Sequence, residues 1–155
     1  LGDVYKRQAQ LRADYPQAHL EIAGSGDLAS ELQAQAQRLN LGESVTFSGF
    51  VTPIEAMGRS DMIVQLSVWE NCSYTLLDAK AAGLKTVATA VGGNPEILGA
   101  DELVDRQSAT LTQDVLQAMR AQLQKGEAEP FTWISNEQMA AQTVDIYTHV
   151  LRGGR

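Results

Sequence analysis

Short apolar strands alternate with helix-like segments along this chain, and this order restricts the possible folds more than any other feature. Runs typical of strands occupy residues 18–23, 45–47, 62–66, 86–89 and 102–105. Helical periodicity occupies residues 27–39, 52–59, 74–82, 111–124 and 135–152. Strands that are connected through helices pair in parallel and need cover on both sides. The pattern therefore predicts the α/β class, with a parallel sheet that has helices on both faces.

The composition suits a domain that does not bind nucleic acid. The 155 residues are 44% hydrophobic, which is enough for one domain with its own core. Acidic residues outnumber basic ones by 19 to 12, which makes the formal net charge −7. Nucleic acid is therefore not an expected partner, because no basic stripe is present to release its counterions.

The cysteine and histidine content argues against disulfide bonds and a metal site. Cys72 is the only cysteine, and His19 and His149 lack the spacing of a ligand pair. No apolar run approaches the roughly 18 residues that a transmembrane helix requires, and no secretory signal is visible. These features predict a cytoplasmic protein without a transmembrane segment.

The first eight residues, LGDVYKRQ, carry no start signal for a domain. We interpret residues 1–8 as an uninformative N-terminal segment or artefact, and residues 9–155 as the domain. Residues 9–14 are expected to be the last turns of a helix. That helix should stop before Tyr15-Pro16, because proline disfavours helix in the residue that precedes it.

Acids and glycines are concentrated in the loops that follow the predicted strands. Parallel strands end at one edge of a sheet, and ligands of such folds bind at that edge. The loops concerned are residues 24–27, 49–53, 67–74 and 90–96. Gly24 and Gly26 form a strand-to-helix turn, but the third glycine of a dinucleotide-binding motif is absent.

Two acids flank the start of the helix that is predicted from residue 74. Seven residues separate Glu70, in the loop, from Asp78, in the helix. Carboxylates accept hydrogen bonds from neighbouring hydroxyls, so the pair suits a sugar or a ribose. The alternative is structural, with Glu70 a surface acid and Asp78 a favourable charge near the helix N-terminus. The spacing alone leaves both interpretations open.

The N-terminus of the same helix offers backbone amides to an anion. Cys72, Ser73 and Tyr74 lie where free N–H groups favour a phosphate, and Ser73 also suits the N-cap position. In the last loop, Gly92 and Gly93 either let the backbone approach a ligand closely or simply form a turn. Both interpretations of each segment stay open on these residues alone.

In their order, these segments resemble the group 1 glycosyltransferases of GT-B fold. The resemblance is carried by LEIAGSGD, LGESVTFSGFV and SDMIVQLSVWENCSYTLLDAKAAGLKTVATAVGGNPEI. It is a resemblance to the C-terminal, nucleotide-sugar-binding half of that fold, which is Rossmann-like, and it is strongest over residues 18–98. It implies that residues 9–155 are a nucleotide-sugar-binding domain with C-terminal helices, and that the family's first strand would precede Leu1.

The resemblance also implies a role for each candidate residue. In the family, the first acid of an acid–seven residues–acid motif approaches the transferred sugar, and the second holds the ribose hydroxyls. The matching residues are Glu70, as the catalytic residue, and Asp78, which is one methylene shorter than the family's glutamate. The other donor-binding residues that the resemblance implies are Gly24, Gly26, Phe50, Val51, Cys72, Ser73, Tyr74, Gly92 and Gly93.

The implied reaction moves a sugar from a nucleotide-diphosphate sugar to an acceptor, with retention at the anomeric carbon and no essential metal or cofactor. The implied partners are the nucleotide sugar and an N-terminal acceptor-binding domain of the same chain. The family's arginine and lysine, which neutralise the donor diphosphate, would precede Leu1, so we expect little or no transfer by this chain alone. The location stays cytoplasmic, and a peripheral membrane contact through the absent domain is left open.

Two other functions are compatible with the same fold. One is a non-enzymatic Rossmann-like module that has kept the fold and lost the site. The other is an epimerase-type GT-B relative that acts on sugar nucleotides, which would need further catalytic acids or histidines near the pocket. Glu70, Asp78 and the glycine loop favour the transferase over the non-enzymatic module, and no further acid or histidine is placed for the epimerase.

The resemblance and the residue types make three predictions about exposure. A sheet neighbour of the absent first strand should be left unpaired. Trp69, although it lies beside Glu70, is expected to be buried. Some side chains that would face another domain in the family should be exposed, and the candidates are Trp133, Ile134, Ile146, Tyr147 and Val150.

Overall fold

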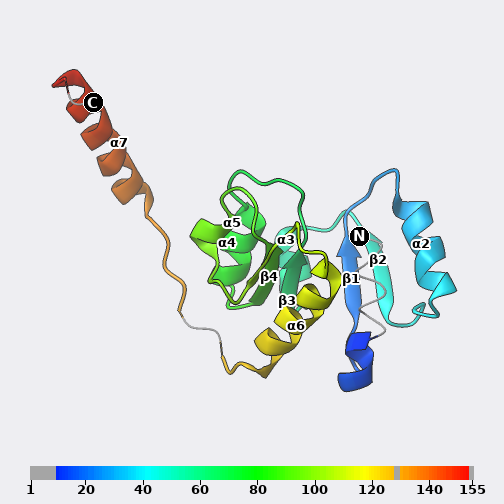
Figure 1. Cartoon of the computed structure of the whole chain (residues 1–155). Helices are drawn as coiled ribbons and strands as arrows, with labels where there is room; N and C mark the ends of the chain where they lie inside the picture. Colours follow the sequence, from blue (N-terminus) through cyan, green and yellow to red (C-terminus); the bar gives the residue numbers. More distant parts are fainter. Residues whose placement is uncertain (1–9, 128–129, 154–155) are drawn as a thin grey trace.

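Parallel strands and interleaved helices make up the part of the chain that the computed structural model describes, residues 10–127 and 130–153 (Figure 1). The strands are β1 Leu20–Ala23, β2 Val45–Gly49, β3 Met62–Gln65, β4 Lys85–Thr89 and β5 Leu103–Val104. The helices are α2 Ala29–Arg38, α3 Pro53–Met57, α4 Tyr74–Ala81, α5 Asn94–Ile97, α6 Leu111–Gln124 and α7 Asn136–Leu151. The predicted α/β class is confirmed, whereas the interpretation of residues 1–8 lies outside the described residues.

Three of the described helices, α3, α4 and α7, begin after a residue whose side chain caps them. Thr52 forms a capping box with the third residue of α3, and Pro53 occupies the first turn. Ser73 caps α4 through its hydroxyl, which is as predicted. Helix α2 differs, because it begins after Leu28 without a side-chain cap, so the predicted start at Asp27 was wrong by two residues.

The strands form two parallel sheets instead of one continuous sheet. β1 pairs with β2, and separately β3 pairs with β4, which pairs with β5. Among the described residues no strand pairing joins β1 to β3, so each of these strands has one strand partner there. Three of the four β3 residues are apolar, yet each of the four is only partly buried. An edge without a strand partner accounts for this exposure.

Side-chain ion pairs connect the two sheets. Arg59, which lies just before β3, donates from Nε to Glu21 Oε2 at 2.8 Å and from Nη2 to Oε1 at 2.5 Å. Glu21 lies on β1 and also accepts a hydrogen bond from the Ser48 hydroxyl. The hydrogen bonds from Arg59 and then Ser48 lower the pKa of Glu21 to about 2. A second ion pair joins Arg120 of α6 to Asp14, the last residue of the N-terminal helical turn.

Helices cover both faces of β4, which lies at the centre of the larger sheet. Val87 packs with Val115 of α6, whereas Ala88 packs with Leu76 of α4. Consecutive strand residues point to opposite faces, so α4 and α6 cover opposite sides of this sheet, as the sequence predicts (Figure 1). The smaller sheet has a separate core cluster with α2, formed by Ala36, Leu41 and Val45.

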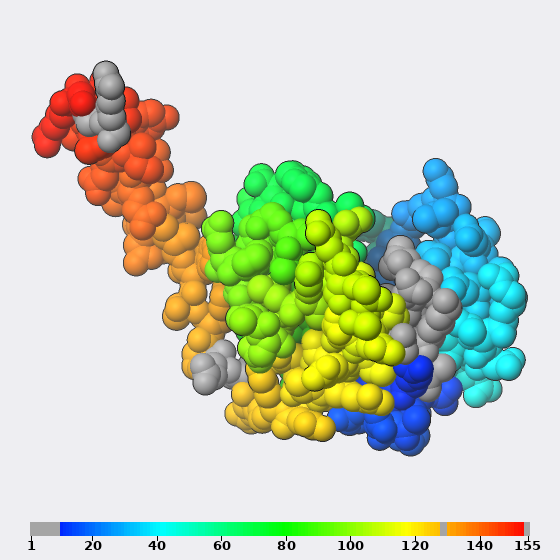
Figure 2. Space-filling model, viewed as in Figure 1, coloured from blue at the N-terminus to red at the C-terminus, as the bar shows by residue number. Residues whose placement is uncertain are grey.

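Helix α7 extends away from both sheets (Figures 1 and 2). None of its 16 residues is buried. The side chains that were predicted to be exposed all are, at 37% to 67% of their surface: Trp133, Ile134, Ile146, Tyr147 and Val150. A helix of this length gains most of its stability from packing, so the exposed apolar side chains suit contact with another surface.

Candidate functional site at the carboxyl edge

The candidate site lies at the carboxyl ends of β1 to β4, where the four glycine- and acid-bearing loops emerge (Figure 1). The fourth segment was predicted to be a loop through Glu96. It is a loop only to Gly93, because Asn94–Ile97 forms the short helix α5 with Pro95 in its first turn. Proline is favoured in a first helical turn, and the sequence analysis did not use that signal here.

Glu70 is held by two hydrogen-bond donors from its own segment. Gln65 Nε2, at the end of β3, donates to Glu70 Oε1 at 2.7 Å, and Ser67 Oγ donates to the same oxygen at 2.7 Å. Within the described residues no hydrogen bond uses Glu70 Oε2. The partly buried Glu70 therefore has one fixed carboxylate oxygen and one that is available to a ligand.

Ser73 connects the start of α4 to the same network. Its buried hydroxyl accepts from the N–H of Leu76 at 3.3 Å and donates to Gln65 Oε1 at 2.9 Å. Gln65 thus contacts both the helix cap and the catalytic candidate Glu70. The sequence analysis missed Gln65 and Ser67, although a glutamine at the end of an otherwise apolar strand was a visible signal.

Gly92 and Gly93 pack against the loop that carries Glu70. A Cβ at Gly92 would lie 1.6 Å from the Glu70 carbonyl oxygen, and one at Gly93 would lie 2.2 Å from that of Asn71. The N–H of Gly93 donates to that Asn71 carbonyl at 3.0 Å. Close packing against the protein's own backbone is therefore a reason for both glycines, and neither sequence interpretation had included it. The backbone that they approach is that of the neighbouring loop of this chain.

Two buried polar residues hold the backbone of the site in place through hydrogen bonds. Thr89, the last residue of β4, donates from Oγ1 to the carbonyl of Ser67 at 2.7 Å. Asn94 donates from Nδ2 to the carbonyl of Thr89 at 3.0 Å. Asn94 is fully buried, and its Oδ1 has no hydrogen-bond partner among the described residues. An unpaired buried oxygen is costly, so it marks a place where a donor from a ligand or water is expected.

Asp78 lies on the exposed side of α4. Leu76 and Ala79 are buried on the opposite side of this helix. Lys80, two residues after Asp78, forms an ion pair with Glu102, in which Nζ lies 2.9 Å from Oε1. Lys80 is thus engaged with Glu102 and does not offer its charge to a ligand at the candidate site.

Three aromatic side chains are exposed in the loops of this edge. Phe50 is 86% exposed, Trp69 is 73% exposed and Tyr74 is 75% exposed. The expectation of a buried Trp69 was wrong, because its loop lies beyond the end of β3, where no helix covers it. Solvent-facing rings at a ligand edge can stack on a planar or sugar ring.

The remaining candidates occupy the first loops and the start of α4. Gly24 has φ +122°, and its N–H donates to the Gly49 carbonyl at 2.5 Å, so it joins the first loop to the second. Gly26 has open space around a Cβ, which leaves room for a ligand. Val51 is partly buried, and Cys72 is an exposed free cysteine.

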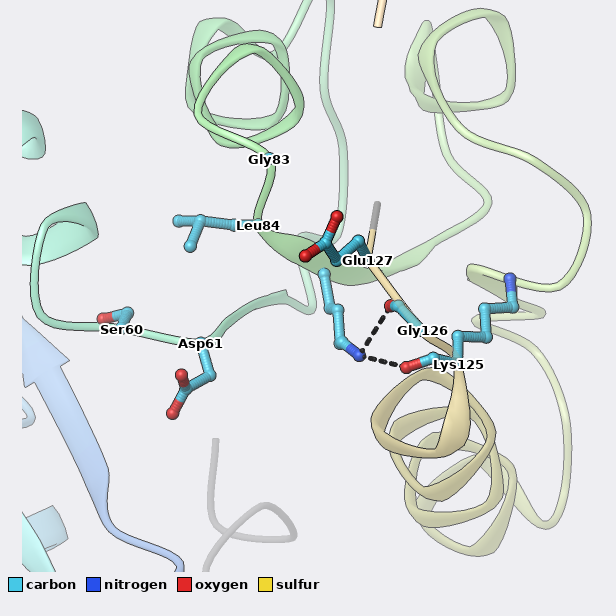
Figure 3. Close-up of a pocket in the computed structure, with 8 residues that line it drawn as sticks. Ser60, Asp61, Gly83, Leu84, Lys125, Gly126 and Glu127 are labelled. Carbon is cyan, nitrogen blue, oxygen red and sulfur yellow. Dashed lines mark hydrogen bonds between the residues drawn. The ribbon is translucent and has the colours of Figure 1, made fainter. Parts of the chain in front are cut away.

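A hollow in the surface lies at the opposite edge of the larger sheet (Figure 3). It is lined by residues at the amino ends of β3 and β4, including Asp61 and Lys85. Lys85 Nζ donates to the carbonyls of Lys125 and Gly126 at 2.7 and 3.3 Å, just after the end of α6. Its charge thus compensates the negative end of that helix. Lys85 therefore lies at the edge of the sheet opposite to the candidate site.

The described residues lack two further features. In residues 10–127 and 130–153, no group of three or more His, Cys, Asp or Glu is arranged to hold a metal ion. None of the described helices is both long and apolar enough to cross a bilayer.

Parallel strands with helices between them and polar loops at one edge define a parallel α/β domain, a class in which ligands bind at the carboxyl ends of the strands. The chain belongs to the family of glycosyl transferases group 1, whose family model matches residues 3–142. Its fold is similar to part of the crystal structure of the pneumococcal O-GlcNAc transferase GtfA in complex with UDP and GlcNAc. That similarity has a TM-score of 0.65 at 19% identity and covers 78% of this chain and 25% of GtfA.

Several curated proteins have similar sequences. The uncharacterized glycosyltransferase MJ1607 of Methanocaldococcus jannaschii is 38% identical over 52% of this chain and 22% of its own length. The alpha-monoglucosyldiacylglycerol synthase of Streptococcus pneumoniae is 30% identical over 61% of this chain and 20% of its own length. The phosphatidylinositol N-acetylglucosaminyltransferase gpi3 subunit of Schizosaccharomyces pombe is 24% identical over 91% of this chain and 33% of its own length. The chain thus spans about a fifth to a third of these relatives.

Proposed function

We propose that this chain is the donor-binding part of a retaining glycosyltransferase that uses a nucleotide-diphosphate sugar. The observation that carries the proposal is Glu70, whose carboxylate is fixed through Oε1 and open at Oε2, at the carboxyl edge of the sheet. Membership of the group 1 family supports it, as does the similarity to a transferase crystallised with UDP and GlcNAc.

Each part of the site has a proposed contact with the donor. Glu70 Oε2 accepts from hydroxyls of the transferred sugar, and Asp78 accepts from the ribose hydroxyls. The first amides of α4, with Cys72, Ser73 and Tyr74, receive the diphosphate, because a helix N-terminus favours an anion. The other proposed contacts come from Gly24, Gly26, Phe50, Val51, Gly92 and Gly93.

In this proposal, the rest of a longer protein binds the acceptor and supplies part of the positive charge that neutralises the diphosphate. Glu70 and Asp78 are both acidic, and the nearby Lys80 is paired with Glu102. A diphosphate near two carboxylates needs cations, so this chain alone should bind a donor weakly and transfer little or no sugar. An acceptor-binding domain of the same protein, with a segment that supplies the cations, would complete the enzyme.

Asp78→Ala should weaken the binding of UDP about tenfold or more, because a bond between a hydroxyl and a carboxylate is lost. Glu70→Gln should leave UDP binding nearly unchanged and slow sugar transfer by about a hundredfold or more, because its charge acts on the transferred sugar. Calorimetric titration of the longer protein with UDP, GDP, ADP and their sugars measures the first effect, and product formation measures the second.

Asp145→Ala is the matched control, because Asp145 is also an exposed helical aspartate but lies on α7. The Asp145→Ala variant should bind nucleotides with the same affinity as the parent protein. Failure of the longer protein to bind any of these nucleotides or their sugars would contradict the proposed function. Binding that survives Asp78→Ala unchanged would contradict the ribose role alone.

A further inference from the structure

Gln65 connects the N-cap of α4 to Glu70 through a single side-chain amide. Its Oε1 accepts from Ser73 Oγ at 2.9 Å, and its Nε2 donates to Glu70 Oε1 at 2.7 Å. The Ser67 hydroxyl lies 3.3 Å from the same Nε2 and donates to Glu70 Oε1 at 2.7 Å. Every polar atom of the glutamine amide therefore has a partner of the opposite kind.

The chemistry of the partners determines the orientation of this amide. An ionised carboxylate only accepts hydrogen bonds, so the amide must turn its NH₂ group to Glu70. The opposite orientation would place the Gln65 oxygen against a carboxylate oxygen and leave Glu70 with one donor fewer. With the NH₂ group directed to Glu70, the amide oxygen faces the Ser73 hydroxyl, which can donate to it because its own oxygen accepts from the Leu76 N–H.

The network therefore runs in one direction from the helix to the carboxylate. The N–H of Leu76 donates to Ser73, Ser73 donates to Gln65, and Gln65 donates to Glu70. Hydrogen bonds in such a chain polarise and strengthen one another. Because both donors to Glu70 act on Oε1, the carboxylate loses its rotational freedom while Oε2 keeps its acceptor capacity.

We propose that Gln65 is a positioning residue, which holds the Glu70 carboxylate in place before the sugar of a nucleotide-sugar donor arrives. This inference rests on the proposed function. A glutamate that is free to rotate must be ordered when the ligand binds, and that ordering reduces affinity. Gln65 removes this cost in advance for the contact with the sugar, and it does not act on the contact with the nucleotide.

The test compares two ligands that differ only in the sugar. In the longer protein, Gln65→Leu should weaken the binding of UDP-N-acetylglucosamine about tenfold and leave the binding of UDP unchanged. Gln65→Glu should weaken the binding of UDP-N-acetylglucosamine at least as much, because a second carboxylate then faces Glu70. Gln33→Leu on α2, at an exposed glutamine, is the matched control and should change neither affinity.

A ligand-free measurement separates this inference from the proposed function. In NMR spectra of the full chain, the side-chain NH₂ protons of Gln65 should exchange with water more slowly than those of Gln33. Glu70→Ala should remove that protection, because it removes the acceptor. If neither UDP nor its sugar binds the longer protein, the proposed function fails while this measurement still reports the network. The positioning role would be overturned if Gln65→Leu lost equal affinity for UDP and UDP-N-acetylglucosamine. It would also be overturned if the side-chain NH₂ protons of Gln65 in the parent exchanged as fast as those of Gln33.

Discussion

Replacing Gly92 by alanine is expected to lower the free energy of unfolding by roughly 2–4 kcal/mol and to displace the loop that carries Glu70. The new Cβ would lie 1.6 Å from the Glu70 carbonyl oxygen and 2.7 Å from its carbonyl carbon. Backbone atoms cannot avoid such a contact by changing a rotamer, so the two loops must separate. The backbone of Gly92 also has φ +52°, which alanine adopts only at a cost.

Urea unfolding of Gly92→Ala at neutral pH measures the loss of stability, and titration with UDP-N-acetylglucosamine measures the loss of the site. Gly42→Ala is the control, because a Cβ at Gly42 meets no atom within 4 Å and the backbone there is not left-handed. Its free energy of unfolding should stay within about 0.5 kcal/mol of the parent. If Gly92→Ala were equally neutral, the close packing of the two loops would be refuted.

Replacing Glu102 by alanine is expected to lower the free energy of unfolding by roughly 2–4 kcal/mol, because it leaves buried polar groups without a partner. The carboxylate of Glu102 accepts hydrogen bonds from Lys80 at 2.9 Å, Thr86 at 2.5 Å and the Gly99 N–H at 2.9 Å. Glu102 is buried and Thr86 is fully buried. Lys80 stays partly exposed and can recover some hydration, which keeps the expected loss below that of a fully buried ion pair.

The same carboxylate makes stability depend on pH. Burial alone raises the pKa of Glu102, but hydrogen bonds from Thr86, Lys80 and Gly99 outweigh it, so the pKa lies below its ordinary value of 4.5. Because its pKa is lowered in the folded state, the Glu102 carboxylate stabilises the fold fully above about pH 4.5. This stabilisation is lost as the pH falls through the folded pKa. The stability gap between the parent and Glu102→Gln should therefore narrow on acidification.

Urea unfolding between pH 7 and pH 3 tests both statements. Asp14→Ala is the control, because it removes one partner of the exposed ion pair between Asp14 and Arg120 and should cost less than about 1 kcal/mol. A Glu102→Ala variant as stable as Asp14→Ala, or a gap to Glu102→Gln that does not change with pH, would contradict the role of this network.

Local chemistry explains why so much of the secondary structure was predictable. Helix α6 has the predicted bounds, and α4 begins at the predicted residue because Ser73 caps it. Thr52 and Pro53 likewise determine the start of α3. Each of these features depends on residues within one turn of the helix, so the chain encodes them without help from distant segments.

The burial of apolar segments, in contrast, depends on distant parts of the chain. β3 has the composition of a buried strand, but its burial depends on whether a second strand lies beside it. Trp69 is apolar and large, but its exposure depends on which helix covers its loop. The apolar residues of α7 have a regular period, yet a period does not reveal whether the helix packs on this domain.

For the site, the order of residue types was enough to predict which residues lie near the carboxyl edge, because strand order and parallel pairing place them there. These residues include Glu70, Ser73, Asp78, Gly92 and Gly93. What they contact depends on the three-dimensional packing of the loops. This packing turns Gln65 toward both Ser73 and Glu70, and it places the two glycines against the neighbouring loop. Hydrogen bonds and close contacts between loops depend on ångström-scale distances, which residue types and their spacing do not specify.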